Sequence, residues 1–152
     1  MKYCIAFLLL HFCLLNTGCK KYPQDEGLSL KTPESRLLGK WKPVKFALND
    51  LEQSTSVLSV YFPYSYIEFK DQGSYQEFSQ DGQLRFLGQW QLQDGKKKLY
   101  TFGTFSIGTT TTVTLNRTWV IEKLTKKNLT VTLLQEDGMN EKKWKLELDN
   151  IQ

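Results

Sequence analysis

The chain has 152 residues, a formal net charge of +4 and a pI near 8.9, and 40% of its residues are hydrophobic. These values are typical of one folded domain and do not indicate a nucleic-acid-binding surface. The one His and three Cys lie at positions 4, 11, 13 and 19. From residue 20 onward the sequence therefore lacks the groups for a Ser-His-Asp triad, a Cys-His pair, a Cys/His zinc site or a disulfide framework.

Residues 1–18 are typical of a signal peptide. Lys2 supplies a positive charge, and the apolar run over residues 5–15 is too short to cross a bilayer. Gly18 then places a small residue directly before Cys19. This pattern resembles the bacterial lipobox, in which the signal peptidase cuts before a cysteine whose thiol carries a diacylglyceryl group. The alternative is a plain signal peptide cut near Gly18, which would leave Cys19 as an unpaired thiol.

The lipobox resemblance implies a mature lipoprotein that is held to a membrane by acyl chains on Cys19. Two or more such chains anchor stably, because each buried methylene contributes about 0.8 kcal/mol. Lys20 follows the cysteine, and by resemblance to bacterial sorting rules this implies the outer membrane of the cell envelope, on its periplasmic or its surface side. Residues 19–36 hold two prolines, a glycine and several charges, which predicts a flexible, lipid-anchored tether.

Residues 37–152 alternate between apolar and polar side chains, which predicts a domain of short β-strands. Ile67 and Phe69, for example, alternate with Glu68 and Lys70. Asp-Gly pairs at 81–82, 94–95 and 137–138 predict hairpin turns. Residues 49–63 are less regular and indicate a short helix or a long loop. The predicted strands cover residues 41–46, 67–70, 74–79, 84–92, 99–107, 113–121, 129–133 and 144–148.

About eight strands joined by hairpins favour a closed, antiparallel, up-and-down β-barrel, because closure removes exposed sheet edges. A β-sandwich is the alternative. Gly-x-Trp occurs at 39–41 and again at 88–90, and a later strand carries Trp-Val-Ile-Glu-Lys-Leu-Thr at 119–125. In this order the motifs resemble the small lipocalin-like lipoproteins of Bacteroidetes, over residues 37–149. The resemblance implies an all-β, lipocalin-like barrel and an envelope location, but no particular activity.

Arg117 is the most informative candidate for a binding site. If residues 113–121 form one strand, Arg117 lies on its apolar face beside Leu115 and Trp119. A guanidinium there needs a partner, and inside a barrel it would meet an anionic head group such as a fatty-acid carboxylate. Alternatively, residues 116–117 form a turn or bulge and place Arg117 in solvent.

Aromatic residues complete the predicted ligand-binding set. Tyr61, Tyr64 and Tyr66 cluster around a proline, where they would form either a rim over the barrel mouth or a plug in it. Trp90 and Trp119 occupy apolar strand positions, where large aromatic side chains commonly pack in cores.

We predict no catalytic residues, no metal and no cofactor, because the strand carboxylates mostly take the polar positions and no Asp spacing matches a calcium loop. The favoured function is a binding module for a small apolar or amphipathic molecule, without enzymatic or nucleic-acid-binding activity. A second hypothesis is a filled barrel whose outer face docks another envelope protein. An enzyme would need a polar pocket around Glu77 or Glu52.

Overall fold

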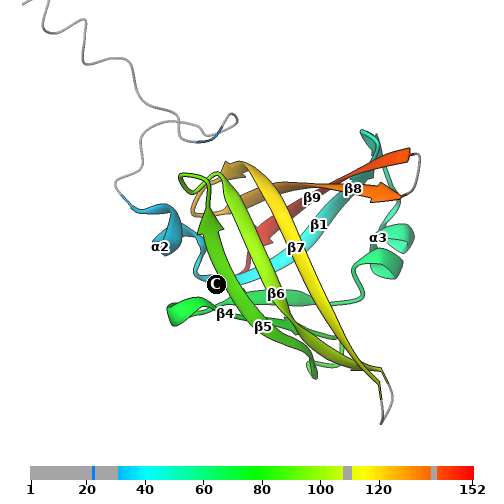
Figure 1. Ribbon diagram of the computed structural model, residues 1–152, viewed down its shortest axis with the longest axis horizontal. Helices are drawn as coiled ribbons and strands as arrows, with labels where there is room; N and C mark the ends of the chain where they lie inside the picture. Colours follow the sequence, from blue (N-terminus) through cyan, green and yellow to red (C-terminus); the bar gives the residue numbers. More distant parts are fainter. Residues whose placement is uncertain (1–21, 23–30, 108–110, 138–139) are drawn as a thin grey trace, which may run out of the picture.

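A computed structural model describes residues 22, 31–107, 111–137 and 140–152. Within these residues, nine antiparallel strands form one sheet in the order β2-β1-β3-β4-β5-β6-β7-β8-β9, and β1 also pairs with β9 to close it (Figure 1). β2 (Leu51–Glu52) pairs only with the last residues of β1, so eight strands form the barrel. The predicted up-and-down barrel is confirmed, and the sandwich is wrong. The barrel strands are β1 (Gly39–Leu48), β3 (Tyr66–Phe69), β4 (Ser74–Phe78), β5 (Leu84–Gln93), β6 (Lys98–Ile107), β7 (Thr111–Leu124), β8 (Asn128–Asp137) and β9 (Asn140–Asn150).

A short helix, α2 (Pro33–Leu37), lies at one end of the barrel, which we call the closed end (Figure 1). The Thr32 side chain caps α2 by accepting from the Ser35 N–H, and Pro33 supplies a favourable first helical residue. Leu37 is fully buried, and the indole N–H of Trp41 donates to the Leu37 carbonyl at 2.7 Å. α2 therefore seals this end with apolar side chains.

The segment expected to be a tether contributes to this seal. The Tyr22 side chain is fully buried, and its hydroxyl donates to the Lys96 carbonyl at 2.8 Å. The Arg36 guanidinium lies 5.6 Å from the centre of the Tyr22 ring and donates to the Leu124 carbonyl. Composition alone predicts an unfolded stretch here, because it averages these few docking residues with the polar ones around them. Cys19 and the division into signal peptide, tether and barrel stay predictions, since residues 1–21 and 23–30 lie outside the described residues.

At the opposite end, which we call the open end, the two strands of the β7–β8 hairpin diverge from each other. β7 pairs with β8 only from Val120 to Leu124, whereas its first half pairs with β6 alone. The second half of β8 likewise pairs only with β9. α3 (Thr55–Tyr61) is the short helix that residues 49–63 indicated, and it lies beside this end (Figure 1). Its N-terminus is capped by Ser54, which accepts from the Val57 N–H.

Aromatic side chains join α3 to the barrel wall. Tyr61 and Phe62 lie within 5.1–6.3 Å, centre to centre, of the rings of Phe46 and Trp144. The edge-to-face geometries between Tyr61 and Trp144 and between Phe46 and Phe62 are ones that aromatic pairs favour. These rings fill part of the open end on the side of β1 and β9.

Candidate functional site

Arg117 lies on the interior face of the barrel. β7 runs without a break through residues 111–124, and Arg117 pairs across the sheet with Thr101 of β6. The single strand assumed in the sequence analysis is therefore confirmed, and the alternative of a turn at residues 116–117 is wrong. Trp119, two residues nearer the closed end, is buried, whereas the Arg117 side chain keeps 27% of its surface exposed. Solvent therefore reaches the interior face of β7 from the open end.

The partner of Arg117 is Glu77 of β4. Arg117 Nη1 lies 3.2 Å from Glu77 Oε1, and the Tyr75 hydroxyl donates to the same oxygen at 2.6 Å. β5 and β6 separate β4 from β7 in the sheet, so this contact crosses the barrel interior. Glu77 is only 8% exposed, and a carboxylate so deeply buried requires partners of this kind.

Tyr64 completes the group, which we call the interior polar cluster: Tyr64, Tyr75, Glu77 and Arg117. Burial raises the pKa of Tyr64 and of Tyr75 well above the usual tyrosine value, and the Glu77 charge raises both further. Burial opposes the charge of Arg117, but the Glu77 carboxylate and the two tyrosines outweigh it and raise the pKa of Arg117. The cluster therefore holds one positive and one negative charge beside two neutral hydroxyls.

The interior polar cluster has unused hydrogen-bonding capacity. Among the described residues, Arg117 has one partner although a guanidinium carries five N–H donors. Within the same part of the chain, Glu77 Oε2 and the Tyr64 hydroxyl have no hydrogen-bond partner. Buried charged groups are stable only when their remaining donors and acceptors are satisfied, so these atoms are suited to contact a further polar group.

Apolar side chains line the interior between the cluster and the open end. Val113 and Leu115 lie on the interior face of β7 and are partly exposed, as are Leu133 of β8 and Trp144 of β9. The Trp144 indole N–H is buried and has no hydrogen-bond partner among the described residues. We use the name open-end cup for these four side chains taken together with the interior polar cluster. The set combines apolar side chains with polar ones, as the lining of small-molecule sites commonly does.

A pair of glycines lies on the interior face beside the polar cluster, since one of them pairs with Tyr75. Gly88 of β5 and Gly103 of β6 lie opposite each other on the interior face. A Cβ atom on Gly88 would clash with the Phe102 carbonyl oxygen and lie 2.8 Å from the Phe86 ring. The Phe86 ring therefore occupies the space that side chains at these two positions would take.

The predicted site residues are only partly brought together. Tyr64 and Arg117 belong to the cluster, and Tyr61, 45% exposed on α3, contacts Trp144 at the mouth of the cup. Tyr66 lies on the outer face, where its ring stacks on Phe78 at 4.7 Å. Tyr66 faces outward because side chains alternate between the two faces of β3, and Ile67 and Phe69 take the interior face.

The two predicted tryptophans pack toward the closed end. The Trp90 ring meets Phe69 edge to face at 6.0 Å, and its indole N–H donates to the Lys70 carbonyl. Trp119 is buried opposite Leu99. These contacts support core packing for both tryptophans, as large aromatics on apolar strand faces commonly show.

Sequence reasoning did not identify Tyr75, and it named Glu77 only as a residue around which an enzyme would need a polar pocket. The register shift between Glu77 and Phe78 disturbs the alternation that would have assigned its face. The sequence nevertheless indicated that both residues face the interior. Tyr75 pairs with the interior residue Phe69 across the β3–β4 turn, and Glu77 lies two residues further along the same face. Glu52 lies in β2 and is exposed, so it does not contribute to the cup.

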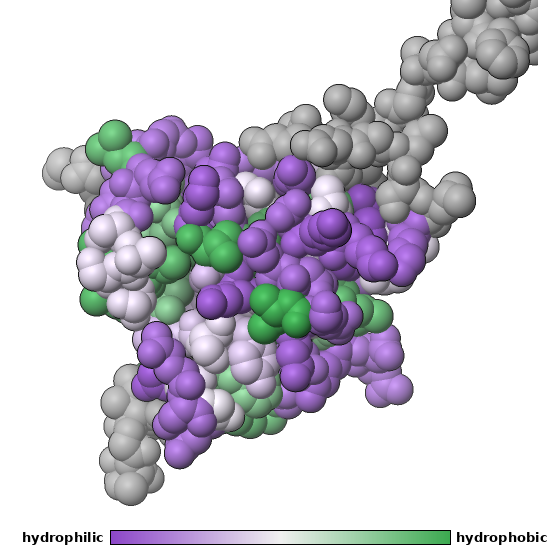
Figure 2. Space-filling model, turned by 180° about the vertical axis from the view of Figure 1, so that it is seen from behind, coloured by the Kyte–Doolittle hydropathy of each residue, from purple (hydrophilic) through white to green (hydrophobic). Residues whose placement is uncertain are grey.

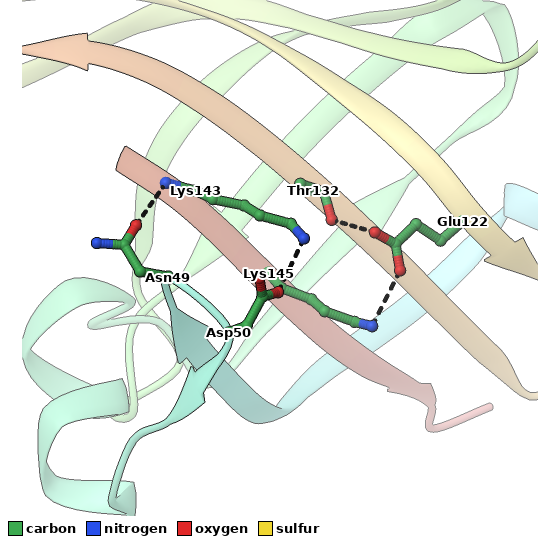
Figure 3. Close-up of polar contacts among 6 residues, drawn as sticks. All are labelled: Asn49, Asp50, Glu122, Thr132, Lys143 and Lys145. Carbon is green, nitrogen blue, oxygen red and sulfur yellow. Dashed lines mark hydrogen bonds and ion pairs between the residues drawn. The ribbon is translucent and has the colours of Figure 1, made fainter. Parts of the chain in front are cut away.

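The outer face of the barrel carries its own charged network (Figure 3). Glu122 accepts from the Thr132 hydroxyl at 2.6 Å and pairs with Lys145 at 3.0 Å. Burial opposes ionisation of Glu122, but these two contacts outweigh it and lower the pKa of its carboxyl. Asp50 pairs with Lys143 at 2.8 Å and raises the pKa of that amine. The network ties the turn after β1 to β9, which is a structural role.

Two surface depressions lie on the outside of the barrel. One of about 510 Å³ is bordered by α2 and the β7–β8 turn at the closed end, and one of about 200 Å³ lies over β1 and β9. The face seen in Figure 2 is mostly hydrophilic, with hydrophobic side chains in separate small patches. This face therefore offers no broad apolar surface to a partner.

No protein-family model matches the chain, and no curated protein matches it significantly. Over the residues that the structure describes, no helix has the length and apolar character needed to cross a membrane. The same residues include no group of three or more His, Cys, Asp or Glu side chains arranged to hold a metal ion.

Proposed function

We propose that the barrel binds a small amphipathic molecule in the open-end cup, with the polar part of that molecule on the interior polar cluster. The observation that carries the proposal is Arg117: it lies inside the barrel, is partly exposed, and uses one of its donors within the described chain. The apolar wall beside it, including Leu115 and Leu133, provides a surface for the rest of the molecule.

We further propose that the protein is an envelope lipoprotein anchored through Cys19. Cys19 comes three residues before Tyr22, whose ring is buried at the closed end. Three residues span at most about 11 Å, so an anchor at Cys19 would lie near this end. The open-end cup would then face away from the membrane, where it is accessible to ligands.

Native mass spectrometry of the protein purified from membranes of its own host tests the binding proposal. We expect a species heavier than the protein by the mass of one small molecule, which lipid extraction recovers. Arg117→Gln should reduce its abundance, whereas Lys145→Gln, which removes a charge from the outer face, should not. Purification of the bare protein alone would count against the proposal.

A filled barrel that docks an envelope protein is the second candidate function. Its supporting observation is the packing of Phe46, Phe62 and Trp144 into one side of the open end, together with the Phe86 ring over the glycine pair. A pull-down from membranes with the lipidated protein distinguishes this filled barrel from the ligand-binding barrel. A stable partner retained by Arg117→Ala, without a bound small molecule, would favour the filled barrel.

A further inference from the structure

Resting on the proposed function, we infer that the open-end cup selects an uncharged, hydrogen-bonding head group, such as an alcohol or an amide, over a carboxylate. One of the two sequence interpretations of Arg117 implied the opposite, because it placed a lone guanidinium inside the barrel. The structure supplies Glu77 as its counter-ion at 3.2 Å, and so changes the chemistry of the site.

The charges of the interior polar cluster are already balanced without a ligand. Glu77 and Arg117 compensate each other, and Tyr64 and Tyr75 are neutral at physiological pH because burial keeps their hydroxyls protonated. A ligand carboxylate bound to Arg117 would bring a second negative charge close to Glu77, in an interior that water screens weakly. An ammonium group bound to Glu77 would meet Arg117 in the same way. Either charged head group therefore leaves one charge uncompensated.

The interior polar cluster offers both hydrogen-bond donors and hydrogen-bond acceptors to a ligand. The cluster keeps donors on Arg117, an acceptor at Glu77 Oε2 and the Tyr64 hydroxyl, which donates and accepts. A hydroxyl or amide head group also combines donors and acceptors, so it matches this mixed set without adding charge. A carboxylate only accepts and leaves the Glu77 oxygen unmatched.

Calorimetric titration with octanol, octanoate and octylamine tests this inference, because the three probes share one alkyl chain. At about pH 8, octanoate is ionised and octylamine is protonated. We expect the wild-type protein to bind octanol at least about tenfold more tightly than either charged probe. In Glu77→Gln, the amide still accepts from Tyr75 but no longer balances Arg117. Octanoate should then gain about tenfold or more in affinity and overtake octanol.

Glu122→Gln is the matched control, since it makes the same change in an ion pair on the outer face. It should leave the order of the three probes as in the wild type. Circular dichroism verifies that each variant is folded, and should Glu77→Gln unfold, the order in which the wild type binds the three probes decides. Equal or tighter octanoate binding by the wild type, unchanged in Glu77→Gln, would overturn the inference and leave the proposed function standing. Failure of all three probes to bind either protein would overturn both.

Discussion

At the scale of single residues, the interior polar cluster explains how an arginine and a glutamate are accommodated inside a barrel. Glu77 Oε1 accepts from both Tyr75 and Arg117, so its charge is compensated at its own position. The Arg117 side chain remains partly exposed, which limits the cost of its burial. The same burial keeps the tyrosine hydroxyls protonated, and this has a consequence for stability at high pH.

The pKa values of Tyr64 and Tyr75 are raised above the ordinary value of 10.0. A pKa raised in the folded state contributes stability that is complete below about pH 10 and is lost as the pH rises through the folded-state pKa. Urea unfolding followed from about pH 8 upward should therefore show a steep alkaline loss. Tyr64→Phe should make that loss shallower, because it removes one of the two buried hydroxyls. Tyr66→Phe is the size-matched control on the outer face, and an alkaline slope in Tyr64→Phe equal to the wild-type slope would contradict the account.

At the scale of elements, the facing glycines of β5 and β6 allow the Phe86 ring to lie against the backbone. A side chain at Gly88 would meet both the Phe102 carbonyl and the Phe86 ring, and neither can move freely within a closed sheet. We expect Gly88→Ala to destabilise the fold by about 1–3 kcal/mol through overpacking. Gln89→Ala, next in the same strand but exposed, should have little effect. Urea unfolding of both variants at neutral pH measures the difference, and equal stabilities would show that the pair is not tightly packed.

Most elements of the barrel could be predicted from local pattern, whereas the site could not. β3 and β9 follow the alternation of apolar and polar residues closely, because each has one face in the core. The contact between Glu77 and Arg117 joins strands that are not neighbours in the sheet, so no pattern along the chain or across a hairpin reveals it. The burial of Tyr22 could not be predicted for a related reason, because a single buried residue in a polar stretch produces no periodic pattern.

At the scale of the whole molecule, the barrel has two unlike ends. α2 and Tyr22 seal the closed end, whereas β7 and β8 diverge beside α3 at the other end (Figure 1). The proposed anchor belongs to the closed end. We expect metabolic labelling with palmitate to mark the wild-type protein and Cys19→Ser to lose both the label and the membrane association. Cys13→Ser is the control, and label retained by Cys19→Ser would contradict the anchor.

Titration of isotope-labelled protein with octanol, followed by heteronuclear NMR, is the decisive experiment for a binding site inside the barrel, because it locates the bound molecule. We expect the amide signals of Glu77, Leu115 and Arg117 to shift with one saturating curve, while those of Glu122 and Lys145 on the outer face stay in place. Saturable shifts confined to the outer face, or none at concentrations near the solubility limit of octanol, would contradict a binding site inside the barrel.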